Sequence, residues 1–126
     1  MQAVLQSRNP LVDCPVDLAN FRSITGADPV LEQRFFRLFF ESSVECLDAM
    51  QTSMKDGACD VWRRQAHALK GTSLNLGAGQ LSQLCLEAQE NHQAQPEKKL
   101  LLLTAIRTEL KRVEQYLNDM RDLATQ

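Results

Sequence analysis

His67 is the residue of this sequence whose type and surroundings best suit chemistry at a side chain. A neutral imidazole is nucleophilic, and the ordinary histidine pKa of about 6.5 leaves much of it neutral near pH 7. Lys70 and Gly71 follow three and four residues later, so both lie beside His67 if the segment is helical. An ammonium can neutralise an anion attached to the ring, and a missing side chain leaves room for a large reactant. This spacing suits transfer of an anionic group such as a phosphoryl.

A helix from about Ala58 to Leu76 is needed to position these residues. At 100° per residue, one apolar arc lies within about 60° of Leu69, whereas His67 lies about 160° away. The predicted core face consists of Trp62, Ala66, Leu69, Ser73 and Leu76. The predicted outward face consists of His67, Arg63, Arg64, Lys70, Gly71 and Leu74. Because a glycine within a helix costs about 1 kcal/mol relative to alanine, Gly71 needs an explanation. Spacing alone also fits a solvated face with an incidental histidine.

Glycine and proline breaks divide the rest of the chain into further helical segments, and no segment alternates with the period of a strand. A short amphipathic segment over Pro15–Ser23 has Val16, Phe21 and Ile24 as its expected inward residues. Asp28 is the expected N-cap and Pro29 the first residue of a long helix that ends at 55–57. Its expected inward stripe is Leu31, Phe35, Leu38, Phe39, Ser42, Cys46, Ala49 and Met50, widened by Phe36, Phe40 and Leu47.

Two more helices complete the pattern. One follows the break at 77–79 and is marked by Leu81, Leu84, Cys85 and Ala88. The last follows a polar loop at 91–96 and repeats apolar residues at intervals of three and four: Leu103, Ile106, Leu110, Val113, Leu117 and Met120. Short loops between four long amphipathic helices predict an all-α fold, an antiparallel up-down four-helix bundle with a short additional N-terminal helix. We expect residues 1–14 to be a flexible N-terminal segment and 15–126 to form the bundle domain.

Composition excludes several classes of protein. The net charge is −2 and the pI is about 5.6, which argues against a nucleic-acid partner. No run of about eighteen apolar residues is present, so we expect no membrane span, and the first residues do not resemble a signal peptide. The four cysteines form no C-x-x-C pair, and we expect free thiols in a cytoplasmic protein. A metal-binding bundle is an alternative, but its available ligands follow no recognised spacing: His67, His92, Cys85 and Glu87.

The sequence also resembles a known family. The segment His67-Ala68-Leu69-Lys70-Gly71-Thr72-Ser73, followed by Leu76-Gly77-Ala78, resembles the signature of histidine-containing phosphotransfer (HPt) domains. Those domains relay phosphoryl groups between receiver-domain aspartates in histidine–aspartate signalling. The resemblance covers roughly residues 15–123, since the short first helix, the Phe-rich helix and the C-terminal helix also fall where the family has them.

The resemblance implies a role for individual residues. His67 matches the histidine that is phosphorylated, at Nε2, and Lys70 matches the lysine near the phosphoryl group. Gly71 matches the glycine that gives the partner access, and Ser73 the small residue that lets the next helix pack closely. Gln89 matches a glutamine that hydrogen-bonds the other ring nitrogen and so orients the histidine; a solvated glutamine at a helix edge is the alternative.

The resemblance also implies partners. We expect a phosphoryl carrier rather than an enzyme, which takes the group from a receiver domain of a hybrid histidine kinase and passes it to a response-regulator receiver. No cofactor is expected on this chain, because Mg²⁺ and the main catalytic groups would come from the receiver. We expect a monomer, and Met1 with the polar tail favours a complete small protein over a domain excised from a kinase. A helical adaptor in which His67 is incidental is the alternative function.

Receiver docking should use apolar surface beside His67. Leu74 lies on the same outward face, one turn beyond Gly71, and the resemblance would bring Ile24 and Leu31 to the same patch. Arg63 and Arg64 would then form a polar rim that mainly affects the association rate. The alternative for Ile24 and Leu31 is that they cap the bundle core.

Overall fold

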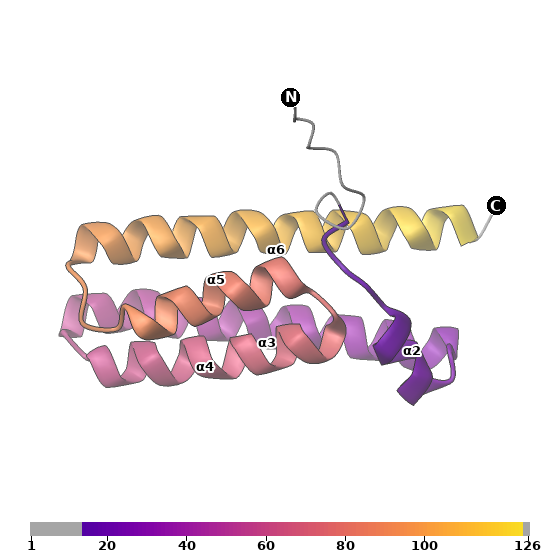
Figure 1. Cartoon of the computed structure of the whole chain (residues 1–126), viewed down its shortest axis with the longest axis horizontal. Helices are drawn as coiled ribbons and strands as arrows, with labels where there is room; N and C mark the ends of the chain where they lie inside the picture. The colour runs from indigo at the N-terminus through magenta and orange to yellow at the C-terminus, as the bar shows by residue number, and fades with distance from the viewer. Residues whose placement is uncertain (1–13, 125–126) are drawn as a thin grey trace, which may run out of the picture.

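The computed structural model describes residues 14–124, with side chains as far as Arg121. The predicted flexible segment 1–14 therefore lies, apart from Cys14, outside the described residues. Within 14–124 the chain forms five helices and no strand, so the predicted all-α class is confirmed (Figure 1). The helices are α2 (Ala19–Thr25), α3 (Pro29–Asp56), α4 (Cys59–Leu76), α5 (Gly79–Glu90) and α6 (Pro96–Ala124).

The four longer helices lie side by side, and in Figure 1 the chain reverses direction between each of them and the next. Helix α4 packs against both α3 and α5, and α6 covers α5 and, over a smaller area, α3. The short α2 lies beside one end of the other helices and contacts α4. The helix that carries His67 therefore touches three other helices and exposes one remaining face.

Local signals in the sequence set the helix boundaries. The Asp28 carboxylate accepts hydrogen bonds from the backbone N–H groups of Val30 and Leu31, at 2.9 and 3.3 Å, and Pro29 occupies the first helical position as predicted. Gly57 and Gly77 end α3 and α4 with φ of 65° and 93°, a left-handed conformation that glycine adopts without strain.

The first helix begins later than predicted, at Ala19 instead of Pro15. Asp17 explains the difference, because its backbone N–H donates to the carbonyl oxygen of Gly77 at 2.9 Å instead of entering a helix. Its side chain accepts from the N–H of Ala19 at 3.1 Å. A side chain at Gly77 would collide with the Asp17 carbonyl, so the N-terminal segment is held closely against the turn between α4 and α5.

The core confirms the predicted faces of α4 and α6. The buried residues of α4 are the five predicted: Trp62, Ala66, Leu69, Ser73 and Leu76. In α6 the predicted stripe is buried from Leu103 to Leu117, and Met120 is half-buried against the same core. No helix of the described residues is long and apolar enough to cross a membrane.

The predicted face of α3 was partly wrong. Leu38 and Leu31, expected inward, are 62% and 46% exposed, and Ser42 is exposed as well. The buried stripe is instead Glu32, Phe36, Phe39, Ser43, Leu47, Met50 and Ser53. Glu32 can be buried because Arg22 of α2 donates to both of its carboxylate oxygens, at 2.9 and 3.3 Å. In this rotation of α3, Glu32 faces inward and Leu31 outward.

Helix α2 differs from expectation in the same way. Val16 and Phe21 are buried as predicted, whereas Ile24 is 78% exposed. Phe21 occupies the inward position by packing on Phe35 and Phe36, with ring centroids 4.8 and 5.7 Å away. The end of α2 therefore presents Ile24 to solvent.

Candidate functional site

His67 lies in the middle of α4 with an exposed side chain, on the face opposite the core. Its Nδ1 is 3.2 Å from Oε1 of Gln89 on α5. Because an amide oxygen only accepts hydrogen bonds, the fitting tautomer carries its proton on Nδ1 and leaves the lone pair on Nε2. In this tautomer Nε2 is the ring nitrogen with a lone pair open to an approaching group.

Two hydrogen bonds between α4 and α5 hold Gln89 in register with His67. Trp62 Nε1 donates to the carbonyl oxygen of Ala88 at 2.8 Å, in the core. Ser82 Oγ donates to the carbonyl oxygen of Lys70 at 3.2 Å. Sequence reasoning missed both contacts, although a single tryptophan among apolar residues signals an indole N–H that needs a buried acceptor.

Ser73 lies where the two helices approach closely. It is fully buried, and its Oγ has no hydrogen-bond partner among the described residues. An unmatched buried hydroxyl costs free energy, so the small volume of the side chain, rather than its hydrogen bonding, fits this position. The role that the family resemblance implies for Ser73, close packing of the next helix, stays a prediction.

Lys70 and Gly71 leave the surface beside the imidazole open and positive. Lys70 is half-buried, and no carboxylate of the described residues forms an ion pair with it. A Cβ added at Gly71 would meet no atom within 4 Å. An approaching group can therefore reach the ring, and an ammonium lies nearby to meet a negative charge.

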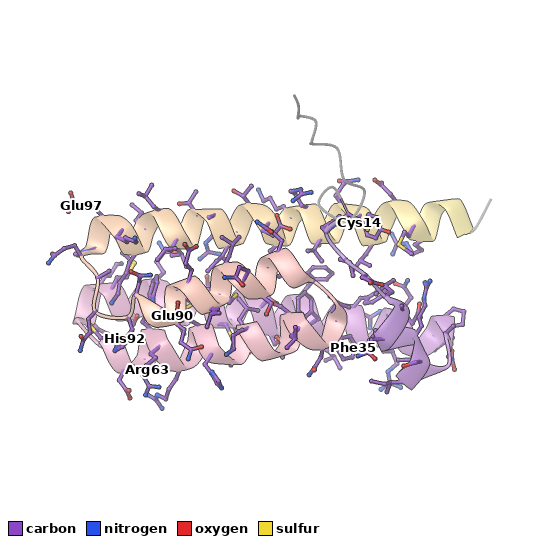
Figure 2. The ribbon with its side chains drawn as sticks, viewed as in Figure 1. Cys14, Phe35, Arg63, Glu90, His92 and Glu97 are labelled. Carbon is purple, nitrogen blue, oxygen red and sulfur yellow. The ribbon has the colours of Figure 1, made fainter. Side chains whose placement is uncertain are left out.

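Arg63 and Arg64 lie one turn before His67 and share one carboxylate. Asp60 accepts from Arg63 at 2.8 Å and pairs with Arg64 at 3.3 Å; the Asp60 and Arg64 side chains are largely exposed and that of Arg63 is half-buried. The hydrogen bond from Arg63 lowers the pKa of Asp60 below its ordinary value. The cluster keeps a net positive charge at the end of the bundle where Figure 2 shows Arg63, on α4, and His92, in the loop after α5.

A second open surface lies where α2, α3 and the end of α4 meet. A cavity of about 640 Å³ is lined there by Phe21, Ile24, Leu31, Phe35, Leu38 and Asn75, among others. Leu74, next to Asn75, is 63% exposed. The structure therefore brings Ile24 and Leu31 into one apolar depression near Leu74. Sequence reasoning missed Leu38 because it assigned this residue to the core, whereas Phe35 lines the depression and also packs against the core as predicted.

The described residues contain no group of three or more histidine, cysteine or acidic side chains that could hold a metal ion. Cys85, one proposed ligand, is fully buried, and burial raises its pKa to about 12. His92 lies with Nδ1 3.1 Å from the carbonyl oxygen of Gln89, at the end of α5. The two histidines thus contact the same residue of α5 separately: His67 contacts the side chain of Gln89, and His92 contacts the backbone carbonyl of Gln89.

Comparison with known proteins gives one family. The family model described as Hpt domain matches residues 34–122, which include α4 and α5 entirely. No curated protein and no solved structure gives a significant match.

Proposed function

The chain belongs to the Hpt domain family, and on that premise we propose that it is a phosphorelay intermediate that carries a phosphoryl group on His67. Membership implies phosphotransfer in histidine–aspartate signalling and interaction with response-regulator receiver domains. The proposal adds a direction: the group arrives from the receiver of a hybrid histidine kinase and leaves to a second receiver. The observation that carries it is the exposed imidazole of His67 with Nδ1 held by Gln89, which leaves Nε2 free.

The transfer step follows from this geometry. The Nε2 lone pair attacks the phosphorus of a receiver's aspartyl phosphate in line with the bond to the carboxylate oxygen. That bond breaks, and the aspartate leaves as a carboxylate. The ring gains positive charge while Nδ1 keeps its proton, so the hydrogen bond to Gln89 Oε1 strengthens as the bond forms. No proton has to leave His67 during the step, and the reverse step delivers the group to the next receiver.

Lys70 and Gly71 serve the same step from the surface of α4. The phosphoryl group brings a charge close to −2, which the Lys70 ammonium partly neutralises. Gly71 leaves space in which the receiver's loops can close around Nε2. We propose that Mg²⁺ and the remaining catalytic groups belong to the receiver, and that this chain is a carrier rather than a catalyst.

Docking of the receiver is proposed on the apolar depression beside Leu74. The exposure of Ile24 and Leu31 and their place in one cavity support a contact surface rather than a core cap. A receiver seated there buries apolar area about two helical turns from His67, and a receiver that also covers the ring would exclude water from the reacting atoms. Arg63 and Arg64 form a charged rim that affects the association rate.

The proposal includes the remaining expectations from the sequence. The four long helices form an antiparallel up-down bundle, supported by the reversals seen in Figure 1. The protein acts as a cytoplasmic monomer whose partners are receiver domains, without nucleic acid or membrane.

Phosphoryl uptake by each histidine tests the function. The chain has two histidines, so His92→Gln is the matched control for His67→Gln. The wild type and the His92 variant, incubated with a panel of phosphorylated receiver domains, are expected to gain acid-labile, alkali-stable phosphate. The His67 variant is expected to gain none while keeping its helical circular dichroism. Normal uptake by the His67 variant, or no uptake by the wild type from any receiver, would contradict the proposal and favour the adaptor.

A further inference from the structure

Lys99, in the first turn of α6, is a buried cation without a buried anion. It is 5% exposed, and its Nζ lies 3.5 Å from Sγ of Cys59 and 5.0 Å from the centroid of the Trp62 ring. Among the described residues, no carboxylate forms an ion pair with it. A buried ammonium normally has a charged partner, because burial removes its hydration. Here the thiol and the indole face take that place.

Cys59 is the first residue of α4, where the helix start adds a second positive influence. The N-cap residue Ala58 supplies no side-chain hydrogen bond, so the first N–H groups of α4 receive none from the cap. The partial positive charge of the helix start and the Lys99 ammonium therefore both lie beside the Cys59 sulfur. The side chain is partly exposed, which admits small solutes.

The other three cysteines do not combine a lysine contact, a helix start and partial exposure as Cys59 does. Cys85 is fully buried and burial raises its pKa to about 12, and burial also raises the pKa of Cys46. Cys14 Sγ donates to the carbonyl oxygen of Val16 at 3.0 Å. Among the described residues, Cys59 alone has a lysine amine as a hydrogen-bond partner of its sulfur.

We propose that Cys59 and Lys99 form an oxidative modification site, at which a hydroperoxide produces a covalent sulfur–nitrogen bond between the two side chains. Peroxide first oxidises the thiol by two electrons, giving Cys59 sulfenic acid and water. Lys99 then releases one proton to solvent, and its amine attacks the sulfur. The S–O bond breaks, water leaves with the second amine proton, and an S–NH bond remains. One peroxide is consumed and two waters are formed.

The geometry favours this condensation over release of the sulfenic acid to other thiols. The nucleophilic nitrogen already touches the sulfur, and the flexible lysine stem can cover the distance from a 3.5 Å contact to a bond. The bond would join the start of the His67 helix to the start of α6, across 40 positions of sequence. A cross-link over a loop of that length restricts the unfolded chain, so the oxidised protein should melt several degrees higher than the reduced one.

Peptide mass spectrometry of the full chain after treatment with hydrogen peroxide tests the site. The expected product is a linked pair of peptides containing Cys59 and Lys99, lighter by two hydrogens than their sum and separated again by dithiothreitol. Cys46→Ser, which removes a thiol elsewhere, is the matched control and should keep the link. Lys99→Arg keeps the positive charge but cannot condense, so Cys59 should accumulate as sulfenic acid that dimedone traps.

Three results would overturn the proposal. One is the absence of the linked pair in the wild type at peroxide doses that oxidise Cys59. Another is that Cys59 is no more readily oxidised than Cys14 or Cys46. The third is an equal yield of links from Cys59 to other lysines in the Lys99→Arg variant. None of these readouts uses phosphoryl transfer, so the site and the proposed function fail independently.

Discussion

Substitution of Gly71 should separate the stability of α4 from its access role. A Cβ at this position meets nothing within 4 Å, so a side chain can be added without a clash. Replacing a mid-helix glycine by alanine then stabilises the helix by about 1 kcal/mol, and glutamine gives somewhat less. For a domain of this size, about 1 kcal/mol corresponds to a rise of roughly 3–5 °C in the thermal midpoint. Both variants should therefore melt above the wild type.

The rate of phosphoryl transfer should fall in these Gly71 variants, although their melting point rises. The glutamine side chain of Gly71→Gln occupies the open space beside His67 that a receiver must enter. We expect its transfer rate to fall at least tenfold, about 1.4 kcal/mol in the activation free energy, and that of Gly71→Ala to fall less. Gly79→Gln, at the start of α5, also adds a side chain in open space and serves as the matched control with normal transfer.

Thermal melting by circular dichroism and initial rates with a phosphorylated receiver measure the two effects. A Gly71→Gln protein that melts higher and transfers at the wild-type rate would refute the access role. A lower melting point in Gly71→Ala would refute the reasoning about open space.

Four further substitutions test the site and the fold. Lys70→Ala should slow transfer about tenfold, because one solvent-screened cation is lost; a rate within twofold of wild type would make it an ordinary surface charge. Leu74→Asp should weaken receiver binding, measured by calorimetry, at least tenfold. The melting point should change by only a few degrees because the Leu74 side chain is 63% exposed, and a collapsed melting point would place Leu74 in the core. Gln89→Leu removes a hydrogen bond of about 1 kcal/mol, so phosphoryl transfer should slow roughly fivefold. The ¹⁵N signals of the His67 ring should also show a changed tautomer, and unchanged signals would contradict the orienting role of Gln89. Asp28→Ala should lower the free energy of unfolding by about 1 kcal/mol in urea titration, and no change would mean that its cap hydrogen bonds contribute little.

The sequence predicts this fold well where one helix has one apolar arc. In α4 the five residues assigned to the apolar arc around Leu69 are the five buried ones, and His67 is exposed as its angle requires. The ends of the helices at Gly57 and Gly77 were predictable for the same local reason, since both glycines adopt left-handed conformations. Periodicity and local conformational preference are sufficient for these features.

Prediction was weaker where a tertiary contact selects among several faces. Helix α3 has apolar residues around most of its circumference, so its pattern alone cannot assign Leu38 to solvent. The ion pair of Glu32 with Arg22 accompanies the observed rotation, and it joins two helices whose relative position the sequence does not reveal. Lys99 illustrates the same limit, because nothing in its local sequence indicates that a lysine is buried against Trp62.

In the candidate site, some features follow from local helix geometry and others depend on tertiary contacts. The exposure of His67 and the space at Gly71 follow from helix geometry alone. The contact with Gln89 depends on how α5 crosses α4, and the hydrogen bonds from Trp62 and Ser82 fix that register. Only the family resemblance could point to Gln89 in advance.

The attachment of Asp17 to Gly77 has a mechanical consequence for docking. Gly77 ends the helix that bears His67, and Asp17 lies two residues before the start of the helix that bears Ile24. In the proposed docking, a receiver that contacts Ile24 therefore touches a helix whose preceding segment is bonded to the end of α4. This hydrogen bond joins the segment before α2 to the end of α4, and we propose that each receiver meets His67 and Ile24 at the same spacing. Discrimination among receivers would then come from how well each receiver matches that spacing.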